Sequence, residues 1–396
     1  MTTPRPVLRL LPSRHKRVVE GHPWIYSNEA QMDAVAKAIP PGSVVKVAAA
    51  DGRMLGAAFF NPHSLICGRM LSREPEAEIG AGFLAQRLRA ALSLRETLYP
   101  RPFYRLVHSE GDGLPGLIVD RFGDVVVCQI NAAGMDRLSD ALLAALDEVL
   151  APKAVVFRND APVRELEGLA REVTVAKGEV QPPIEIEEGG ARFLVDPVAG
   201  QKTGWFFDQR DNRGFMAALA RGRRVADFYA YTGGFAILSA LAGAREVRAF
   251  DASQPALDLA GKSAELNGVA AACRFTKAEA FGEMERLGGA GERFEVVICD
   301  PPAFVKSRKD VNAGAKGYRK MARLAAALVA PGGFLFAASC SHNMETARFA
   351  AEIHKGIAQA GRAARVIRQA GASPDHPIHP SLPESAYLKA EVLQLD

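Results

Sequence analysis

Short apolar runs broken by Gly and Pro fill the first 75 residues, and this pattern is typical of short strands. Within them, SVVKVAAADGRMLGAAFF (residues 43–60) places two apolar stretches on either side of Asp51-Gly52. An Asp-Gly pair between such stretches is a strong signal for a tight turn joining antiparallel strands. We therefore predict a small β-rich domain over residues 1–75.

The next region, residues 76–188, mixes the two periodicities and predicts a compact α/β domain. Its expected elements are a helix over 80–99, two strands around Gly123 within 116–130, an amphipathic helix over 135–151 and a strand over 153–160. The segment IEIEEGGARFLVDP (residues 184–197) predicts a hairpin that turns at Gly189-Gly190 and leads into the last domain.

From about residue 190 onward, predicted strands and helices alternate with short connections. The strands are expected at 223–230, 246–251, 273–278, 294–300 and 332–340, and the helices at 234–244, 255–268 and 318–330. This alternation predicts a parallel sheet covered by helices on both faces. Ligands of such sheets bind at the carboxyl ends of the strands, so we expect the chemistry of residues 189–396 there.

Composition changes this picture little. The 396 residues are 48% hydrophobic and 24% charged, and 49 Lys and Arg against 45 Asp and Glu leave a net charge of +4. A nucleic-acid surface must therefore be local. The five cysteines are scattered without CxxC spacing, which argues against a disulfide framework and against a metal site. We find no export or membrane-spanning segment and expect a cytoplasmic protein.

The first strand of the last domain runs into DFYAYTGGF, so that Gly233 and Gly234 open the next helix. Glycines there let a ligand approach the backbone, although a tight turn that needs a positive φ would also explain them. A nicotinamide-binding strand usually continues into GxGxxG, whereas this strand holds the acidic Asp227 instead. A cationic amino group can pair with that carboxylate.

Two further acidic residues follow the next two strands. Asp251 stands where a carboxylate accepts the hydroxyls of a ribose, with a helix N-cap as the alternative. Glu279 can face an adenine edge, or it can be a solvated surface residue. Together with Asp227, these residues describe S-adenosylmethionine better than they describe NAD.

The fourth strand ends in Asp300-Pro-Pro-Ala-Phe304. Consecutive prolines cannot continue a strand ladder, so they fix where Asp300 and Phe304 point. Asp300 can accept a hydrogen bond from the exocyclic amine of cytosine or adenine, and Phe304 can stack on an extruded base. The alternative is a structured loop without a ligand.

Cys340 ends the fifth strand, which lies beside the fourth in a sheet of this type. Most cysteines are simply buried, but this position faces the expected pocket. A thiolate there can add to carbon 6 of cytosine and make carbon 5 nucleophilic enough to take a methyl group. Cys299 directly precedes Asp300 on the fourth strand. Strand alternation should point its thiol to the opposite face of the sheet, so we interpret Cys299 as a core residue.

Several motifs together resemble the RlmI-type large-subunit ribosomal RNA cytosine-5 methyltransferases. In the last domain they are VADFYAYTGGFA, FDASQPALDLAGKSAELN, CDPPAFVKSR, ASCSH and DHPIHPSLPESAYLK, and upstream they are GHPWIYS, GDGLPGLIVDRFGD and GQKTGWFFDQRDNR. The resemblance spans nearly the whole chain. GQKTGWFFDQRDNR and GDGLPGLIVDR are long and specific, whereas TGGF and DPPAF are shared by many methyltransferases.

The resemblance implies three domains: an RNA-binding PUA domain over residues 1–75, a central α/β domain over 76–188 that binds RNA or serves as a linker, and a class I methyltransferase domain over 189–396. It implies Cys340 and Asp300 as catalytic residues and S-adenosylmethionine as cofactor. The residues implied around that cofactor are Asp227, Tyr231, Thr232, Gly233, Gly234, Phe235, Asp251, Ala252, Glu279, Ala280 and Asp300. Lys202, Thr203, Phe207, Gln209 and Arg210 in the junction motif are implied to close over cofactor or RNA.

Two departures from the family pattern stand in this chain. Positions that are commonly Leu-Asp-Leu-Phe are Ala226-Asp-Phe-Tyr229 here, and Glu279 replaces the more usual aspartate. The better-known RNA cytosine-5 methyltransferases also carry a second cysteine, where this chain has Pro302 or Ala303. Asp300, water or His342 must then remove the proton from carbon 5, and the sequence does not choose among them.

Two basic segments indicate RNA contact. Lys306 and Arg308 directly follow Pro301, Pro302 and Phe304, which we predict to grip the base, and they can hold flanking phosphates. In SRHKRVVEGHPWIY, the basic residues Arg14, Lys16 and Arg17 precede two aromatic residues, Trp24 and Tyr26, that can stack on unpaired bases. A solvated charged face is the alternative for this second segment.

Three rival functions remain open at this point. One is methylation of another base position, such as an exocyclic amine of guanine or adenine. Another is an RNA-binding protein with a degenerate catalytic domain, against which the intact acidic strand ends argue. A nicotinamide dehydrogenase is disfavoured by the glycine pattern. A homodimer is compatible with this architecture, although no residue indicates one.

Overall fold

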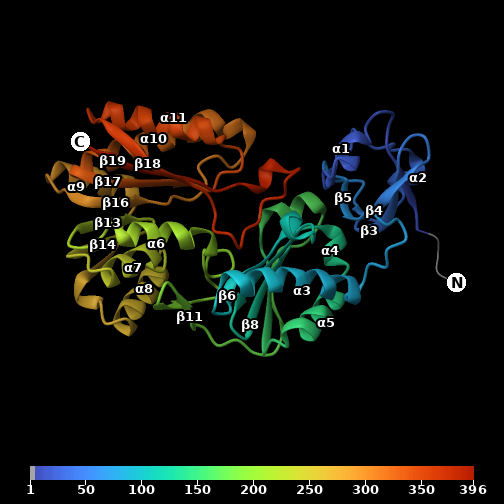
Figure 1. Cartoon of the computed structure of the whole chain (residues 1–396), viewed down its shortest axis with the longest axis horizontal. Helices are drawn as coiled ribbons and strands as arrows, with labels where there is room; N and C mark the ends of the chain where they lie inside the picture. The colour runs from blue at the N-terminus through green and yellow to red at the C-terminus, as the bar shows by residue number, and fades with distance from the viewer. Residues whose placement is uncertain (1–4) are drawn as a thin grey trace. The chain divides into compact units, whose positions relative to one another are not determined.

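The computed structural model describes residues 5–396, which divide into two compact units (Figure 1). The first unit contains residues up to 182 together with Pro197–Trp205 and Pro374–Ser385. The second unit contains Pro183–Asp196, Phe206–Ser373 and Ala386–Asp396. The junction motif GQKTGWFFDQRDNR is therefore shared between the two units, because the boundary follows Trp205.

The N-terminal part of the first unit is the predicted β-rich domain. Its sheet has the order β1-β3-β4-β5-β2, and two short helices accompany it. The predicted hairpin is present, since β3 pairs antiparallel with β4 across the Asp51-Gly52 turn. The elements are β1 Val7–Arg9, α1 Lys16–Val19, β2 Trp24–Ile25, α2 Ala34–Lys37, β3 Ser43–Ala48, β4 Met54–Phe60 and β5 Gly68–Ser72.

The rest of the first unit is built on a second five-stranded sheet, in the order β10-β9-β8-β7-β6. The sequence predicted α3, α5 and three of its strands, but it did not predict α4, β6 or β10. Strand β6 is wholly buried although it carries Arg105 and His108, because Arg105 pairs with Asp120 inside the fold. The elements are α3 Ala81–Leu98, β6 Phe103–His108, β7 Leu117–Phe122, β8 Val125–Ile130, α4 Ala133–Asp136, α5 Ser139–Leu150, β9 Ala154–Asn159 and β10 Glu172–Lys177.

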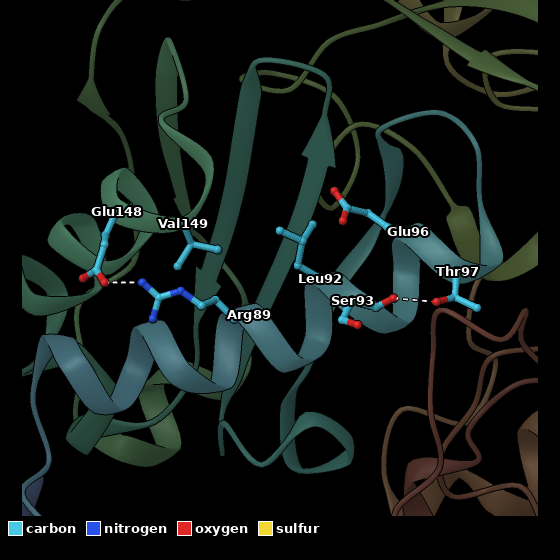
Figure 2. A pocket seen from close by; sticks show the side chains of 7 residues that line it. All are labelled: Arg89, Leu92, Ser93, Glu96, Thr97, Glu148 and Val149. Atoms are coloured by element: carbon cyan, nitrogen blue, oxygen red, sulfur yellow. Dashed lines mark hydrogen bonds and ion pairs between the residues drawn. The ribbon is translucent and has the colours of Figure 1, made fainter.

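A surface hollow lies along α3 where this helix meets the C-terminal end of α5 (Figure 2). Arg89 of α3 and Glu148 of α5 form an exposed ion pair across it, and Leu92 and Val149 supply its apolar side chains. None of the residues predicted to bind cofactor or RNA lines this hollow. This hollow therefore holds none of the predicted chemistry.

The second unit begins with the predicted hairpin, formed by β11 Ile184–Glu188 and β12 Ala191–Val195 around Gly189-Gly190. A buried ion pair holds it against the following helix α6, Arg210–Ala218. Arg213 donates to both carboxylate oxygens of Glu188, at 2.6 and 3.0 Å, and also to the Phe206 carbonyl at 2.8 Å. This two-pronged geometry fixes the start of the domain.

The main sheet of the second unit has seven strands in the order β15-β14-β13-β16-β17-β19-β18. The first five strands of that order are parallel, as predicted, whereas β19 runs antiparallel to β17 and β18. We did not predict these last two strands. The strands are β13 Arg224–Phe228, β14 Glu246–Asp251, β15 Cys273–Lys277, β16 Phe294–Cys299, β17 Val329–Ser339, β18 Ala364–Ala370 and β19 Lys389–Leu395.

Helices cover both faces of this sheet, so both faces are apolar (Figure 1). Alternation along each strand separates the two cores: Ala226 and Cys299 face one of them, whereas Val225 and Ile298 face the other. The helices are α7 Gly234–Leu241, α8 Gln254–Leu266, α9 Ala280–Gly289, α10 Val311–Leu328 and α11 Thr346–Gln359.

Within residues 5–396, no helix combines the length and the apolar character that a membrane span requires.

Candidate active site

Four neighbouring strands of the second unit end at the same edge of the sheet. Strand β13 pairs in parallel with β14 and with β16, and β16 pairs in parallel with β17. Cys299 at the end of β16 lies opposite Ala337 of β17, so that Asp300 and Cys340 both follow at this edge. The fold therefore brings Asp227, Asp251, Asp300 and Cys340 to one side of one domain.

The turn between β13 and α7 has the conformation that its glycines predicted. Gly233 is the N-cap residue of α7 with φ +80°, which side chains rarely adopt. A Cβ there would also lie 3.0 Å from the Cβ of Ala260. Tyr229 and Tyr231 have positive φ as well, at 65° and 49°. This turn is therefore a strained segment that the surrounding packing holds in place.

Asp227 is a buried carboxylate at this turn. It is 1% exposed, and neither of its oxygens makes a hydrogen bond of good geometry. Burial, followed by the charges of Asp300 and Asp251, raises the pKa of Asp227 well above its usual range. The Oγ1 of Thr232 is likewise buried without a hydrogen-bond partner. Buried acceptors of this kind usually have a partner, which can be a ligand or an ordered water.

The two other acidic residues take part in local hydrogen bonds. Asp251 accepts from the Tyr231 and Ser253 N–H groups at 2.9 and 2.8 Å, one on each oxygen, which leaves further acceptor capacity on both. Glu279 is the N-cap residue of α9 and accepts from Phe281 and Gly282. A capping role thus explains Glu279 locally, and its contact with an adenine stays a prediction.

These residues fit the polar groups of S-adenosylmethionine. The orphaned carboxylate of Asp227 suits an ammonium group, and the open acceptor positions of Asp251 suit ribose hydroxyls. Of the other residues predicted around the cofactor, Phe235 in α7 and Ala280 in α9 are buried, whereas Ala252 after β14 is exposed. Their contact with the cofactor stays a prediction.

The thiol of Cys340 sits between two locked serines. Ser339 and Ser341 are both 0% exposed, whereas Cys340 is partly exposed. The Tyr318 hydroxyl of α10 bonds both serine hydroxyls, at 2.7 Å to Ser339 and 2.8 Å to Ser341. The Ser341 N–H also donates to the Ser339 hydroxyl at 3.2 Å. The backbone on both sides of the thiol is therefore fixed from the protein interior.

The same hydroxyl groups hold the Asp300–Phe304 loop. The Val305 N–H donates to the Ser341 hydroxyl at 3.2 Å, and the Phe304 N–H donates to the Tyr318 hydroxyl at 3.4 Å. The Phe304 ring packs on the Tyr318 ring with centroids 4.7 Å apart and near the Phe281 ring at 6.0 Å. The loop of the predicted base-gripping residues and the loop of the thiol thus share one anchor.

The remaining residues of this loop differ in exposure. Pro301 is buried, whereas Pro302, Lys306 and Arg308 are exposed. The Lys306 carbonyl accepts from the Asn343 side chain at 3.4 Å, which links the two loops a second time. The exposed side chains of Lys306 and Arg308 are available to a polyanion, and their contact with RNA stays a prediction.

Tyr387 and Lys389 bring the C-terminal tail to the thiol loop. The Tyr387 ring stacks on the His342 ring with centroids 5.1 Å apart, and the Tyr387 hydroxyl donates to Asp208. Lys389 contacts the backbone of the same loop. No sequence pattern marked Tyr318, Tyr387 or Lys389 as a site residue, although the last two lie in the motif DHPIHPSLPESAYLK that carried the family resemblance.

The junction residues of the second unit are held mainly by the protein. Phe207 and Gln209 are 1% and 2% exposed, and the Gln209 side chain accepts from Asn212 at 2.7 Å. The guanidinium of Arg210 lies 5.3 Å from the centroid of the Phe207 ring. Their expected closure over cofactor or RNA stays a prediction, whereas their packing around α6 is evident.

The other predicted RNA residues lie in the first unit. Lys202 is exposed with φ +49°, and Arg14 and Lys16 are exposed. Arg17 pairs with Glu29 at 2.9 Å and lies over the Tyr26 ring. These contacts occupy part of the basic segment but leave its other cations at the surface.

The stacking of Trp24 on RNA bases stays a prediction, and the structure gives its partly exposed indole ring polar partners within the protein. Its indole N–H donates to Glu110 at 2.7 Å, and the Arg69 guanidinium lies 5.7 Å from its ring centroid. Arg69 itself pairs with Glu110 and Glu167. Trp24 therefore belongs to a polar network that links the first sheet to Glu110 and Glu167.

The core interpretation of Cys299 is confirmed. The side chain is 0% exposed and packs among the residues on the α10 side of the sheet. Burial, followed by the charges of Asp227 and Asp300, raises the pKa of the Cys299 thiol well above its usual range. A thiol of this kind is a poor nucleophile.

Asp227 gives a prediction with a defined sign. Because its pKa is higher in the folded protein than in the unfolded chain, its contribution to stability falls as the pH rises from the ordinary carboxyl range through the raised pKa. We expect Asp227→Asn to raise the melting temperature of the ligand-free protein, and more so at higher pH. The variant should also lose the increase in melting temperature that S-adenosylhomocysteine gives to the wild type.

Thermal unfolding with and without this ligand, at about pH 5 and about pH 8, measures both effects. Asp258→Asn, at an exposed position of α8, is the matched control and should change neither. A lower melting temperature for ligand-free Asp227→Asn with an intact ligand effect would contradict the assignment.

Gly314 gives a second prediction. A Cβ at this position of α10 would lie 2.4 Å from Val305 Cγ2 and 2.7 Å from the Phe304 carbonyl oxygen, so the loop that holds Phe304 and Val305 would have to move. We expect Gly314→Ala to lower the free energy of unfolding by about 1–3 kcal/mol, as overpacking does. Gly261→Ala in α8 has open space around its Cβ and should gain up to about 1 kcal/mol. Urea unfolding compares the two, and equal gains would refute the close approach.

Comparison with known proteins agrees with this geometry. A PUA-like domain family matches residues 8–73, and a family described as S-adenosylmethionine-dependent methyltransferase matches residues 171–386. The ribosomal RNA large subunit methyltransferase I of Erwinia tasmaniensis is 37% identical over 388 residues, covering 96% of this chain and 97% of the relative. The protein of the same name from Aeromonas salmonicida is 36% identical, covering 97% and 98%.

Two solved structures have the same fold over nearly their whole length. One is described as a SAM-dependent methyltransferase from Streptococcus mutans, with a TM-score of 0.83 at 20% identity, covering 98% of this chain and 100% of that one. Another, described as a methyltransferase complexed with SAH, has a TM-score of 0.84 at 20% identity and covers 99% and 100%. The chain therefore belongs to the S-adenosylmethionine-dependent methyltransferases, in the family of the proteins named ribosomal RNA large subunit methyltransferase I.

Proposed function

We propose that this protein methylates carbon 5 of a cytosine in large-subunit ribosomal RNA, with Cys340 as the nucleophile. The observation that carries the proposal is the partly exposed thiol of Cys340, which lies at a strand end next to that of Asp300. Both serines that flank the thiol are hydrogen-bonded to the buried Tyr318 hydroxyl. The names of the relatives support ribosomal RNA as the substrate. Free RNA and a partly assembled particle both expose such a base.

The covalent step begins at the thiol. The Cys340 thiolate adds to carbon 6 of the cytosine, which forms a sulfur–carbon bond and places the electron pair of the 5,6 double bond on carbon 5. Bound S-adenosylmethionine supplies an electrophilic methyl group to that carbon and leaves as S-adenosylhomocysteine. A base then removes the proton from carbon 5, the double bond re-forms, and the sulfur–carbon bond breaks to release the thiolate.

Asp300 and His342 are the titratable side chains on the two loops that would remove this proton, directly or through water. Asp300 follows β16 beside the thiol, and His342 is held in place by the Tyr387 ring. The Asp300 carboxylate can also accept a hydrogen bond that the exocyclic amine of cytosine donates. Phe304 would contact the base through the part of its ring that Tyr318 and Phe281 leave uncovered.

The donor site is proposed on the neighbouring strand ends. Asp227 would pair with the ammonium of the methionine group, Asp251 with the ribose hydroxyls, and Gly233 would let the donor approach the backbone. Lys306 and Arg308 would contact phosphates beside the target nucleotide. The PUA-like domain, with Arg14 and Lys16 exposed, would add a second RNA contact.

Five cysteines without a disulfide fit the reducing cytoplasm that we propose as the location of this protein.

The test is nucleoside mass spectrometry of unmodified large-subunit ribosomal RNA after incubation with S-adenosylmethionine. We expect 5-methylcytidine from the wild type and a loss of roughly 10⁴-fold or more in Cys340→Ala, as removal of a covalent nucleophile gives. Cys273→Ala is the matched control, because Cys273 is also partly exposed but lies at the start of β15. A methylated purine, or full activity in Cys340→Ala, would overturn the proposal.

A further inference from the structure

A lysine is buried directly beneath the thiol loop. Lys389 is the first residue of β19, lies opposite Ser339 of β17 and is 6% exposed. Its Nζ donates to the Ser341 and Met344 carbonyl oxygens, both at 2.7 Å. These two carbonyls lie on the loop that starts with Cys340. An ammonium has three donors, so two bonds to neutral carbonyls leave one donor available.

The charge of this ammonium has no carboxylate partner among residues 5–396, where none of the ion pairs includes Lys389. Burial lowers the pKa of Lys389, and the Cys340 thiolate opposes that shift. A buried cation without an anion is costly, and proteins rarely keep one without a function. The nearby group that can carry the compensating negative charge is the thiol that we propose as nucleophile.

The other titratable groups around this position have partners of their own. Glu391, on the same strand, accepts from His354 of α11 at 2.9 Å and from Gln369 of β18 at 3.1 Å. Tyr318 of α10 is engaged with Ser339 and Ser341, and burial raises its pKa. On the tail and loop, Tyr387 donates to Asp208 and stacks on His342. Asp300 follows the adjacent strand β16.

We propose that Lys389 is a positioning residue that stabilises the thiolate of Cys340 through its charge while it holds the thiol loop by two carbonyls. This inference rests on the proposed function. An ammonium beside a thiol favours the thiolate, which is the reactive form. The same charge helps the last step, because a thiolate that is stabilised leaves carbon 6 more readily. Ser341 is thus bound at its carbonyl by Lys389 and at its hydroxyl by Tyr318.

The test measures the thiol itself and does not need methyl transfer. Iodoacetamide alkylates thiolates, so the rate of Cys340 alkylation against pH, read by peptide mass spectrometry of the full-length protein, gives the ionisation of this thiol. We expect Lys389→Met to move the profile upward by about one pH unit or more, which is about a tenfold slower alkylation at the acidic end. Lys389→Arg, which keeps the charge and donors, should follow the wild type.

Three further readouts separate charge from packing. Lys389→Gln keeps two donors for the carbonyls but removes the charge, and it should shift the alkylation profile like Lys389→Met even if the latter folds poorly. Lys355→Met, at an exposed position of α11, should leave the profile unchanged. With RNA and donor, Lys389→Met should lower kcat and leave KM for both substrates near the wild-type values.

An alkylation profile that is the same in wild type, Lys389→Met and Lys389→Gln would overturn the inference, and so would a shifted profile in Lys389→Arg alone. Failure of the proposed function has a different signature: wild-type protein would form no 5-methylcytidine, or Cys340→Ala would retain activity. Unchanged profiles with normal 5-methylcytidine formation by the wild type would therefore reject only the role of Lys389.

Discussion

Parallel pairing of β13 with β14 and β16, and of β16 with β17, is the constraint on which the site depends. Parallel strands that are in register end at one edge, so residues far apart in sequence meet there. Two consequences follow for this chain. The strained turn follows the buried carboxylate of Asp227 along the chain, and Cys340 and Asp300 both follow the ends of paired strands.

Rigid support beneath the thiol is the second feature of the site. Tyr318 binds both serines next to Cys340, and through Ser341 it also reaches the backbone of Val305. Lys389 binds the same loop from β19. A nucleophile needs its orientation fixed before the substrate arrives, and side chains that are themselves buried and hydrogen-bonded provide this. The antiparallel strand β19, which lies between β17 and the edge strand β18, therefore supports the loop of the proposed nucleophile.

Sequence patterns predicted much of this fold because they report local structure. Alternation along β16 was enough to assign Cys299 to the core, and the Asp51-Gly52 turn was enough for a hairpin. Contacts that depend on tertiary packing left no such signal. The contacts of Tyr318 and Lys389 with the thiol loop join residues that are far apart in the chain, and so does the bond from Trp24 to Glu110. Glu279 was ambiguous because a helix cap and a ligand contact use the same carboxylate.

Covalent attack by Cys340 is the central claim, and trapping the adduct tests it most directly. RNA that carries 5-fluorocytidine at the target position would be incubated with the protein and S-adenosylmethionine, and the products digested for mass spectrometry. Fluorine on carbon 5 cannot be removed as a proton is, so the sulfur–carbon bond would persist. The account predicts an RNA-linked peptide in which Cys340 carries the nucleotide. Linkage to another cysteine, or no adduct under conditions where ordinary RNA is methylated, would contradict it.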